Sequence, residues 1–319
     1  MVIIIKEGNI LKMEDNRKLV LEIDFYNMVF GSYHSKPLIN QLGQNVNAII
    51  GFFNKLKFMK ETFNPDYIVA ASDMSRNTTF RRKIYPPYKA QRKPKDENIM
   101  WQCRIIKQMF GLLGFQVIEN SFYEADDLLG MMAKYNHEHN MKTIIVSGDR
   151  DLYQLVDDDV FLVSPVSGAF VDREYIRKYY DLTPEQWIDL KILKGDPSDN
   201  IKGVEGIGDK TAMKLMHTYG SLNKIYDSLI NIHPPIAKRL ERAIPNLQLI
   251  RELVTIITDY TRINYDMKMI LRREPFVKEL FDVISYIGAP SLAEPMRQCL
   301  LPQKDDKIGV YDNAYNKIN

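Results

Sequence analysis

Cysteine is almost absent from this chain of 319 residues. Its two cysteines, Cys103 and Cys299, are too few and too far apart for a disulfide framework or a cysteine-ligated zinc site. Long hydrophobic runs are also missing, because the apolar run Val2–Ile5 ends at Lys6 and Glu7, far short of a signal sequence or a membrane span. We therefore expect a soluble cytoplasmic protein that makes no membrane contact.

Histidine, the other common zinc ligand, is also scarce, with five residues in the chain. His137 and His139 form one His-x-His pair at an expected helix end, which is typical of a solvated surface pair. His34, His217 and His233 have no partner at ligand spacing. A zinc site built on histidine is therefore not expected.

The net charge is only +2, but the two signs are separated along the chain. Between Asp73 and Asp96 lies a basic segment without any acid, which contains Arg76, Arg81, Arg82, Lys83, Lys89, Arg92, Lys93 and Lys95. Most basic runs are solvated surface loops. Here Tyr85 and Tyr88 are interleaved with the cations, which favours a binding site for a polyanion.

The order of expected elements predicts an α/β core followed by helices. Short β-branched or apolar runs predict strands at 18–24, 67–71, 115–118, 143–147, 160–164 and 169–171. Apolar residues at helical spacing predict helices at 44–63, 97–113 and 124–135 between these strands, and later helices from Thr183 and at 211–219, 236–243, 247–258 and 277–287. Alternating strands and helices are typical of a mostly parallel twisted sheet with helices on both faces.

The hydrophobic content of 45% allows more than one buried core in a chain of this length. We expect an N-terminal extension at 1–17, either a small hairpin or a loose arm. We then expect an α/β core at 18–180, with the basic segment at 74–96, and an all-helical region at 181–301. The polar residues 302–319 are expected to form a mobile tail.

Acidic residues follow several of the expected strands. Asp24 and Asp73 lie at strand ends, Glu124, Asp126 and Asp127 open a helix, and Asp149 and Asp151 follow the strand 143–147. Asp196 and Asp199 form a further group in a later loop. Each group alone is ordinary turn or helix-capping chemistry. Because ligands bind at the carboxyl ends of strands in an open α/β sheet, we expect these groups to converge.

Converging carboxylates repel one another unless a cation neutralises them. An all-oxygen ligand set favours Mg²⁺ or Mn²⁺ over Zn²⁺. Two or more such ions would fit the number of acids and would suit the in-line displacement of a phosphoryl group. The acids therefore predict a metal-dependent site for phosphodiester chemistry.

The segment Gly203–Ala212 is rich in glycine but does not match a nucleotide-binding loop. Asp209 separates Gly208 from Lys210, and a strand does not precede the segment. The alternatives are an ordinary glycine-rich turn and a helix–hairpin–helix. In the second, Gly203, Gly206 and Gly208 would let backbone N–H groups approach a DNA phosphate at the start of the following helix. Lys210, Thr211 and Lys214 would then lie beside it.

Five segments in this order resemble the motifs of the 5′-nuclease family. They are Leu21–Asp24, Phe80–Arg82 with Tyr85–Arg92, Glu124–Leu128, Gly148–Leu152, and Gly195–Asn200 running into Gly203–Ala212. The family includes bacteriophage 5′→3′ exonucleases and ribonuclease-H-type enzymes, flap endonucleases, and the 5′-nuclease domain of bacterial DNA polymerase I. The resemblance implies a PIN-like nuclease core with a helix–hairpin–helix.

The resemblance also implies roles for single residues. It places one metal cluster on Asp24, Asp73, Glu124, Asp126 and Asp149, and a second on Asp127, Asp151, Asp196 and Asp199. Lys89 and Arg92 would contact the scissile phosphate, and the basic segment would form an arch over a single strand. DNA contacts are expected from Arg81, Arg82, Tyr88 and Lys93 in the arch and from Gly203, Gly206, Gly208, Lys210, Thr211 and Lys214 in the hairpin. A K⁺ ion at the hairpin is a further expectation.

The implied activity is the metal-dependent hydrolysis of phosphodiester bonds near 5′ ends of branched, nicked or RNA-primed duplexes. This activity would serve primer removal in DNA replication, and repair. The expected partners are DNA, RNA–DNA duplexes and replication proteins. The expected oligomeric state is a monomer. The expected location is the cytoplasm, which would be that of the host if the protein comes from a phage. Two alternatives remain open, a PIN-type single-strand ribonuclease and a non-catalytic protein that binds DNA structures. The first would lack the helix–hairpin–helix, and the second would be expected to lose carboxylates.

Overall fold

A computed structural model describes residues 2–6, 9–13, 16–74 and 77–302 of the chain, with side chains from residue 16 onward. The expected mobile tail lies outside these residues apart from Pro302, and so do residues 75 and 76 of the basic segment. Within the described part, the helices are all too short or too polar to cross a membrane.

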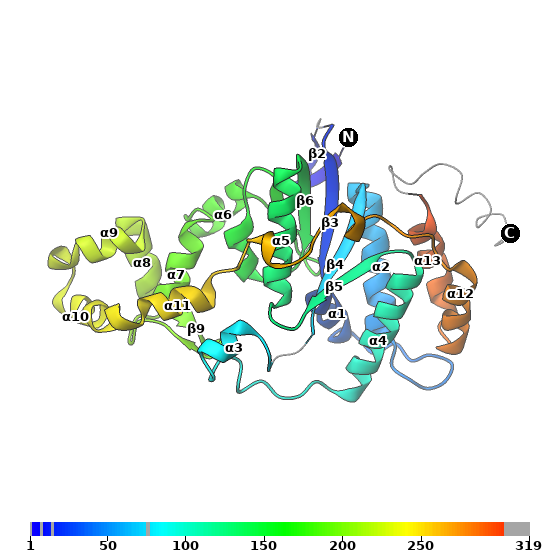
Figure 1. Ribbon diagram of the computed structural model, residues 1–319, viewed down its shortest axis with the longest axis horizontal. Helices are drawn as coiled ribbons and strands as arrows, with labels where there is room; N and C mark the ends of the chain where they lie inside the picture. Colours follow the sequence, from blue (N-terminus) through cyan, green and yellow to red (C-terminus); the bar gives the residue numbers. More distant parts are fainter. Residues whose placement is uncertain (1, 7–8, 14–15, 75–76, 303–319) are drawn as a thin grey trace.

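The core is a six-stranded sheet with helices on both faces, as the sequence predicts (Figure 1). Neighbouring strands pair in parallel except for the last two, which are antiparallel. The order across the sheet is β5 (Gln116–Asn120), β4 (Tyr67–Asp73), β3 (Lys18–Asp24), β6 (Met141–Val146), β7 (Val160–Val163) and β8 (Phe170–Val171). The central strands are buried on both faces, which explains their continuous apolar runs.

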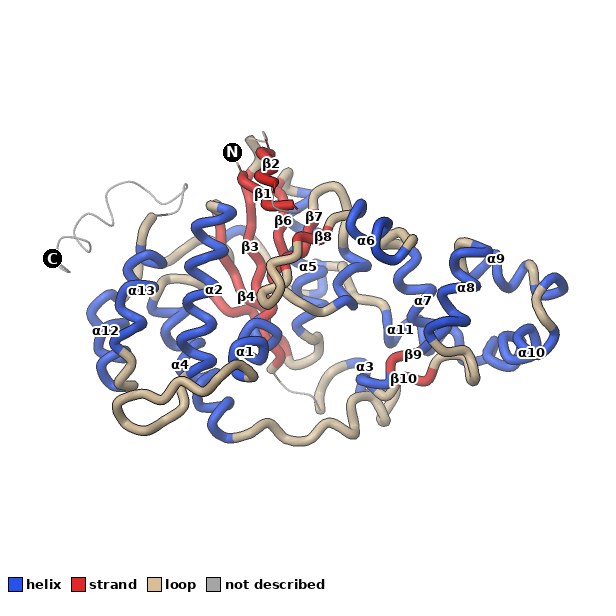
Figure 2. The backbone as a smooth tube through the Cα atoms, turned by 180° about the vertical axis from the view of Figure 1, so that it is seen from behind, coloured by secondary structure: helices blue, strands red, loops and turns tan. Residues whose placement is uncertain are grey.

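Alternate residues of the central strands enter two separate cores. On one face, Leu21 and Ile23 pack with five helices: α1 (Phe25–Tyr33), α2 (Asn47–Phe63), α4 (Glu97–Leu112), α12 (Val277–Tyr286) and α13 (Ala293–Leu300). On the other face, Val20 and Ile145 pack with α5 (Ala125–Glu138) and continue into the core of the helical region. Figure 2 shows the sheet between these layers, with the helical region to one side.

The second core extends into a helical arm. Its helices are α6 (Arg173–Tyr180), α7 (Gln186–Lys194), α8 (Asp209–Tyr219), α9 (Leu222–Asp227), α10 (Pro234–Ala243) and α11 (Leu247–Val254). Between α7 and α8 lie the two-residue strands β9 (Gly195–Asp196) and β10 (Ile201–Lys202), which pair with each other. After α11 the chain returns along α5 to reach α12 and α13 on the far side of the sheet (Figure 1).

Shorter elements complete the fold. The N-terminal extension contains a hairpin of β1 (Val2–Lys6) and β2 (Asn9–Met13), and the basic segment contains the helix α3 (Phe80–Ile84). The 3-10 helices are η1 (Arg150–Leu155), η2 (Pro197–Asp199), η3 (Leu229–Asn231), η4 (Ile244–Asn246), η5 (Tyr260–Arg262), η6 (Met267–Met269) and η7 (Pro290–Leu292).

Several element bounds differ from those that the sequence predicts. Helix α1 follows β3 directly, whereas the sequence reasoning left this segment without a helix. Helix α7 begins at Gln186 rather than at Pro184, although the Gln186 side chain accepts a hydrogen bond from the Thr183 N–H, as in a capping box. Helix α11 ends at Val254, four residues early, because Thr255 is already extended.

Candidate metal centre and nucleic-acid interface

Three acids reach the same edge of the sheet because their strands are parallel. Asp24 is the last residue of β3, Asp73 is the last residue of β4, and Asp149 follows β6 by three residues. Each of the three carboxylates also accepts a hydrogen bond from a backbone N–H group at this edge. Asp24 caps α1 by accepting from the Asn27 N–H at 3.1 Å, and Asp149 caps η1 by accepting from the Asp151 N–H at 2.9 Å. Local capping therefore fixes the direction of both carboxylates.

The start of α5 brings two more acids to this edge. Glu124 is the N-cap of the helix, and Asp126 lies in its first turn. Asp73 joins the end of β4 to the start of α5, because its carboxylate accepts a 2.9 Å hydrogen bond from the Ala125 N–H. The N-terminus of the helix thus faces the strand ends, where its dipole favours negative charge.

The remaining acids come from the loop between α7 and α8. A Cβ on Gly195 would lie only 2.3 Å from the backbone nitrogen of Gly203, so the two glycines let the loop close on itself. The φ angle of Gly195 is +72°, which also favours glycine. Closure leaves Asp196 and Asp199 at the tip of the loop, and Asp196 accepts hydrogen bonds from the N–H and hydroxyl of Ser198.

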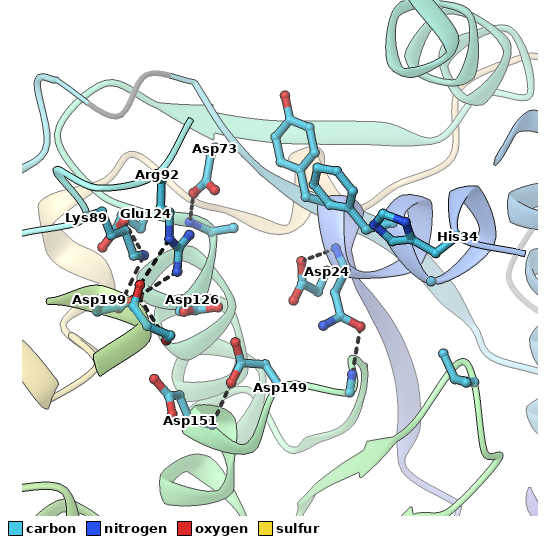
Figure 3. Close-up of a pocket in the computed structure, with 18 of the residues that line it drawn as sticks. Asp24, His34, Asp73, Lys89, Arg92, Glu124, Asp126, Asp149, Asp151 and Asp199 are labelled. Carbon is cyan, nitrogen blue, oxygen red and sulfur yellow. Dashed lines mark hydrogen bonds and ion pairs between the residues drawn. The ribbon is translucent and has the colours of Figure 1, made fainter. Parts of the chain in front are cut away.

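The acids meet in one cleft of about 890 Å³. Eight of the nine predicted metal ligands line it, namely Asp24, Asp73, Glu124, Asp126, Asp149, Asp151, Asp196 and Asp199. Figure 3 labels all of them except Asp196. Oxygen atoms of Asp151, Asp196 and Asp199 all lie within 4.8 Å of one another, close enough for one ion. The structure therefore brings together groups that are up to about 175 residues apart in sequence.

Burial and mutual repulsion raise the pKa values of several of these carboxyl groups. Burial and the nearby charges of Asp149 and Asp73 raise the pKa of Asp24 to about 7, despite hydrogen bonds from Ser147 and Asn27. The same two causes, burial first and then Asp149, raise the pKa of Asp151 to about 6 and that of Asp126 well above its usual value. Divalent cations would relieve this repulsion, so the residues fit a metal site with oxygen ligands.

Asp127 does not join the cleft and is a correction to the predicted ligand set. It is fully buried and forms two hydrogen bonds with the Arg81 guanidinium, at 2.6 and 2.8 Å. Its oxygens also accept from the N–H groups of Glu124 and Ile257. These four bonds occupy the lone pairs that a metal would need.

Arg81 is likewise corrected from a DNA contact to an internal one. Its side chain is 4% exposed and also donates to Glu124 and to the carbonyl oxygens of Leu253 and Thr255. It therefore joins the basic segment, the start of α5 and the end of α11. Tyr88 is buried too, and its hydroxyl donates to Glu124 at 2.7 Å and lies 3.1 Å from a carboxylate oxygen of Asp199.

Lys89 and Arg92 lie in the cleft, where they pair with acids (Figure 3). Lys89 donates to Glu124 at 2.7 Å and Arg92 donates to Asp199 at 2.5 Å. Burial alone would raise the pKa of Glu124, but Lys89 and Arg81 outweigh it and hold this pKa below its usual value. The backbone N–H of Lys89 also donates to the Asp199 carbonyl at 2.9 Å, so the basic segment is attached to the acidic loop.

Of the other predicted arch contacts, Arg82 donates to the Tyr88 carbonyl at 2.6 Å, and Lys93 is exposed.

Sequence reasoning missed one buried cation. Lys191 of α7 forms ion pairs with Asp151 and, at 2.7 Å, with Asp196. Burial would raise the pKa of Asp196, but the charge and hydrogen bond of Lys191 outweigh it and bring this pKa to about 2. The one available signal was the spacing of Lys191 and Asp196, which lie five residues apart at a helix end.

A row of aromatic rings on α1 and its C-cap residue was also missed. Tyr26, Phe30 and His34 line the same cleft, and their rings stack with centroids 5.9 and 6.2 Å apart. The signal in the sequence was their four-residue spacing, which places them on one face of a helix.

The glycine hairpin lies between α7 and α8, in a helix–hairpin–helix arrangement. Gly206 has a φ of +73°, and a Cβ there would lie 2.8 to 3.0 Å from the guanidinium of Arg239 on α10. Gly208 is the N-cap of α8, and a Cβ there would meet nothing within 4 Å. Lys210, Thr211 and Lys214 follow in α8, with both lysines exposed. The open backbone at Gly208 is thus available to an anion, whereas Gly206 is needed for packing against Arg239.

Comparison with known proteins identifies a family for both parts of the chain. A family model for the 5′-3′ exonuclease N-terminal resolvase-like domain matches residues 18–181, and one for the 5′-3′ exonuclease C-terminal SAM fold matches residues 182–278. The thermostable DNA polymerase I of Thermus filiformis is 33% identical over 270 residues, which cover 84% of this chain and 32% of that protein. The DNA polymerase I of Mycobacterium tuberculosis is 34% identical over 255 residues, covering 77% of this chain and 28% of that protein. The chain thus spans about a third of the length of these relatives.

Solved structures show the same fold at lower identity. The T5 5′-exonuclease with bound zinc ions superposes with a TM-score of 0.63 at 20% identity, over 89% of this chain and 98% of that one. The catalytic core of Rad2 in complex with a DNA substrate superposes with a TM-score of 0.56 at 13% identity, over 90% of this chain and 93% of that one. At these identities the likeness concerns the fold.

Proposed function

The chain belongs to the 5′-3′ exonuclease family, and on this premise we propose that it hydrolyses phosphodiester bonds near the 5′ ends of branched, nicked or RNA-primed duplexes. It would act both as a 5′→3′ exonuclease and as a flap endonuclease. The processes that need this activity are primer removal during DNA replication and DNA repair.

The observation that carries the proposal is the convergence of eight carboxylates in one cleft. The raised pKa values of Asp24, Asp126 and Asp151 mark these three as groups that are destabilised without a cation. We assign Asp24, Asp73, Glu124, Asp126 and Asp149 to one metal position, and Asp151, Asp196 and Asp199 to a second. Mg²⁺ or Mn²⁺ suits oxygen ligands, and such ions when bound supply an activated water and charge neutralisation at phosphorus.

The cations of the cleft would contact the scissile phosphate. Lys89 and Arg92 now pair with Glu124 and Asp199, so these pairs would have to open when metal takes over the acids. The freed guanidinium and ammonium groups would then stabilise the negative charge of the transition state. The rest of the segment at 74–96 would form the arch over a single 5′ strand, with Arg82 and Lys93 as further contacts.

The helical region would hold duplex DNA or an RNA–DNA duplex. Gly203 to Gly208 would present backbone N–H groups to a phosphate, with Lys210, Thr211 and Lys214 beside it and a K⁺ ion at the hairpin. The proposed units are the core at 18–180 and the helical region at 181–301, of which the last two helices, α12 and α13, pack on the sheet of the core. We further propose a monomeric cytoplasmic enzyme that works with replication proteins.

End-labelled flap, nicked and RNA-primed duplexes, incubated with and without Mg²⁺, test this function directly. We expect products released from the 5′ side in the presence of Mg²⁺ and none in EDTA. Cleavage of single-stranded RNA alone would instead support a PIN-type ribonuclease. Tight duplex binding without cleavage in either Mg²⁺ or Mn²⁺ would support a non-catalytic binding protein.

A further inference from the structure

Asn27 lies in the first turn of α1 and lines the acidic cleft. Helix side chains point toward the N-terminus of their own helix. The N-terminus of α1 lies at the sheet edge where the acids meet, because Asp24 is its N-cap and accepts from the Asn27 N–H at 3.1 Å. The Asn27 side chain therefore lies beside the carboxylates without being one of them.

One hydrogen bond fixes the orientation of the Asn27 carboxamide. The Gly148 N–H, which can only donate, lies 2.8 Å from the side-chain oxygen Oδ1. The amide nitrogen Nδ2 is then at the other end of the group. Nδ2 has no hydrogen-bond partner among the residues that the structure describes, and protein atoms do not enclose it. Its two hydrogens therefore face the solvent of the cleft at a fixed position.

A neutral donor suits this wall of the cleft better than a cation would. Lys89 and Arg92 form ion pairs with Glu124 and Asp199, and a cation beside Asp24 would pair with it in the same way. A carboxamide cannot form an ion pair, so it leaves the carboxylates available to metal. It still offers N–H groups to a phosphate oxygen, and hydrogen bonds to a charged acceptor are among the strong ones.

We propose that Asn27 contacts the substrate, with Nδ2 donating to a phosphate oxygen of the strand that is bound at the metal ions. Asn27 approaches this phosphate from the α1 side of the cleft, whereas Lys89 and Arg92 lie on the side of Glu124 and Asp199 (Figure 3). The inference rests on the proposed function, because it needs a phosphodiester substrate in the acidic cleft.

Ser147 provides the comparison with a purely structural role. Its hydroxyl donates to Asp24 at 2.8 Å and accepts from the Asp149 N–H at 3.1 Å. Its side chain is buried and does not line the cleft. Ser147 is thus a positioning residue, which orients carboxylates and cannot reach a substrate. Loss of its hydroxyl should change how tightly metal binds, whereas loss of the Asn27 amide should change how a phosphate is held.

Fluorescence anisotropy with a labelled 5′-flap duplex, in Ca²⁺ and in EDTA, tests the contact without relying on cleavage. In EDTA the carboxylates repel the phosphate, so Asn27→Ala should bind as the wild-type protein does. In Ca²⁺ the phosphate can enter the cleft, and we expect Asn27→Ala to bind about tenfold more weakly, the scale of one hydrogen bond to a charged group. Asn54→Ala, at an exposed asparagine of α2 outside the cleft, is the matched control and should equal the wild-type protein under both conditions.

Asn27→Asp decides between a substrate contact and an orienting role. It keeps an oxygen for the Gly148 N–H but replaces the donor by an acceptor, so the proposal requires it to bind in Ca²⁺ at least as weakly as Asn27→Ala. Wild-type affinity of either variant in Ca²⁺ would overturn the contact. Thermal melts in EDTA show that each variant is folded.

Single-turnover flap cleavage in Mg²⁺ gives the second readout. Asn27→Ala should lower the rate by about 10- to 100-fold at an unchanged Mg²⁺ concentration for the half-maximal rate. Ser147→Ala should instead raise that concentration. If the wild-type protein cleaves and Asn27→Ala cleaves at the same rate, the contact is wrong and the proposed function stands. If the wild-type protein does not cleave, the proposed function is wrong, and the affinities in Ca²⁺ still decide the contact.

Discussion

The acidic cleft and the basic groove beside the glycine hairpin are formed by neighbouring stretches of one loop. They differ in that the cleft buries carboxylates and the groove carries exposed cations. Asp196 and Asp199 of the loop face the cleft, and Lys202 to Gly208 line the groove. In the cleft, carboxylates are buried beside one another, and several have raised pKa values. The groove, of about 1120 Å³ between the glycine hairpin and α10, is instead lined by cations, of which Lys202, Arg239 and Arg242 are exposed. The side chains of Lys202 and Arg242 have no hydrogen-bond or ion-pair partner among the described residues.

The difference shows how burial determines what a charged site needs. Buried like charges are costly without a compensating ion, so the cleft should depend on metal and on pH. Exposed cations are hydrated and screened, so the groove should depend on salt and hardly on pH between 5 and 8. Four substitutions or conditions can break or sharpen this contrast.

Asp149→Asn should have the largest effect. Loss of a carboxylate that holds metal should remove several kcal/mol of transition-state stabilisation, on the order of a thousandfold in single-turnover cleavage rate. Duplex binding in EDTA should be retained, and the metal-free protein should be no less stable, because Asp149 raises the pKa values of Asp24, Asp126 and Asp151. The control is Asp158→Asn, at a side chain that is 95% exposed outside the cleft. Wild-type cleavage by Asp149→Asn in Mg²⁺ would remove Asp149 from the metal site.

Lys89→Ala should lower the single-turnover rate by about two to three powers of ten, the scale of one preorganised electrostatic contact. It should also let the pKa of Glu124 rise, since Lys89 is the main group that lowers it. Lys95→Ala, later in the same basic segment, should mainly weaken binding. Rates measured at saturating enzyme separate the two, and small, equal effects would show that the segment is an ordinary solvated loop.

The metal-free protein should become less stable as the pH rises from about 5 to 8. The folded state keeps protons on Asp24 up to a pKa of about 7 and on Asp151 up to about 6. An unfolded aspartate titrates near a pKa of about 3.9. Unfolding therefore releases protons in this window, and stability decreases with pH.

Thermal melts in EDTA should show this as a fall of several degrees in Tm, since about 1 kcal/mol corresponds to roughly 2–4 °C in a chain of 150–250 residues. Mg²⁺ should reduce the fall, and Asp24→Asn should flatten the curve. The pH dependence of duplex binding serves as the internal control for that of Tm. We expect duplex binding to change little, because lysine and arginine keep their charge throughout this pH range. A Tm that rises steadily from pH 5 to 8 in EDTA would contradict the repulsion in the cleft.

Gly208→Ala should have the smallest effect. A methyl group at the N-cap of α8 would obstruct a phosphate, but its φ of −92° and the open space around it leave the fold unstrained. We expect duplex affinity to fall a few-fold at unchanged Tm. Gly111→Ala in α4 is the control, since that position is also open and lies far from the hairpin in sequence. Gly206 is unsuitable for this test because a side chain there would collide with Arg239.

Much of the fold could be predicted from local patterns. The six sheet strands lie where the apolar runs indicated them, and β3 has the predicted bounds. Helix α1 was missed because aromatic residues also occupy its less buried face, so the buried residues Phe25, Met28 and Val29 do not stand out in the sequence. The short helix α3 was missed because a run of cations does not reveal that one of them, Arg81, is buried.

Part of the candidate site could also be predicted from the sequence, because the strand ends place several of its acids. Parallel strands deliver their carboxyl ends to one edge, so the acids of β3, β4 and β6 could be placed together without a structure. The aromatic face of α1 and the role of Arg239 could not, because each depends on which elements pack side by side. The family resemblance assigned Asp127 to a metal, and its pairing with Arg81 could not be predicted because it also depends on tertiary packing.

The sequence by itself determined where strands and helices form and which acids reach the edge of the sheet, because propensity, periodicity and capping act over a few residues. Only the tertiary structure decided which charge meets which partner. Arg81 binds Asp127 across 46 residues and Lys191 binds Asp151 across 40. Such pairs are selected by the burial and geometry of the folded chain, because a carboxylate accepts a metal, an arginine or a backbone N–H according to what lies within about 3 Å of it.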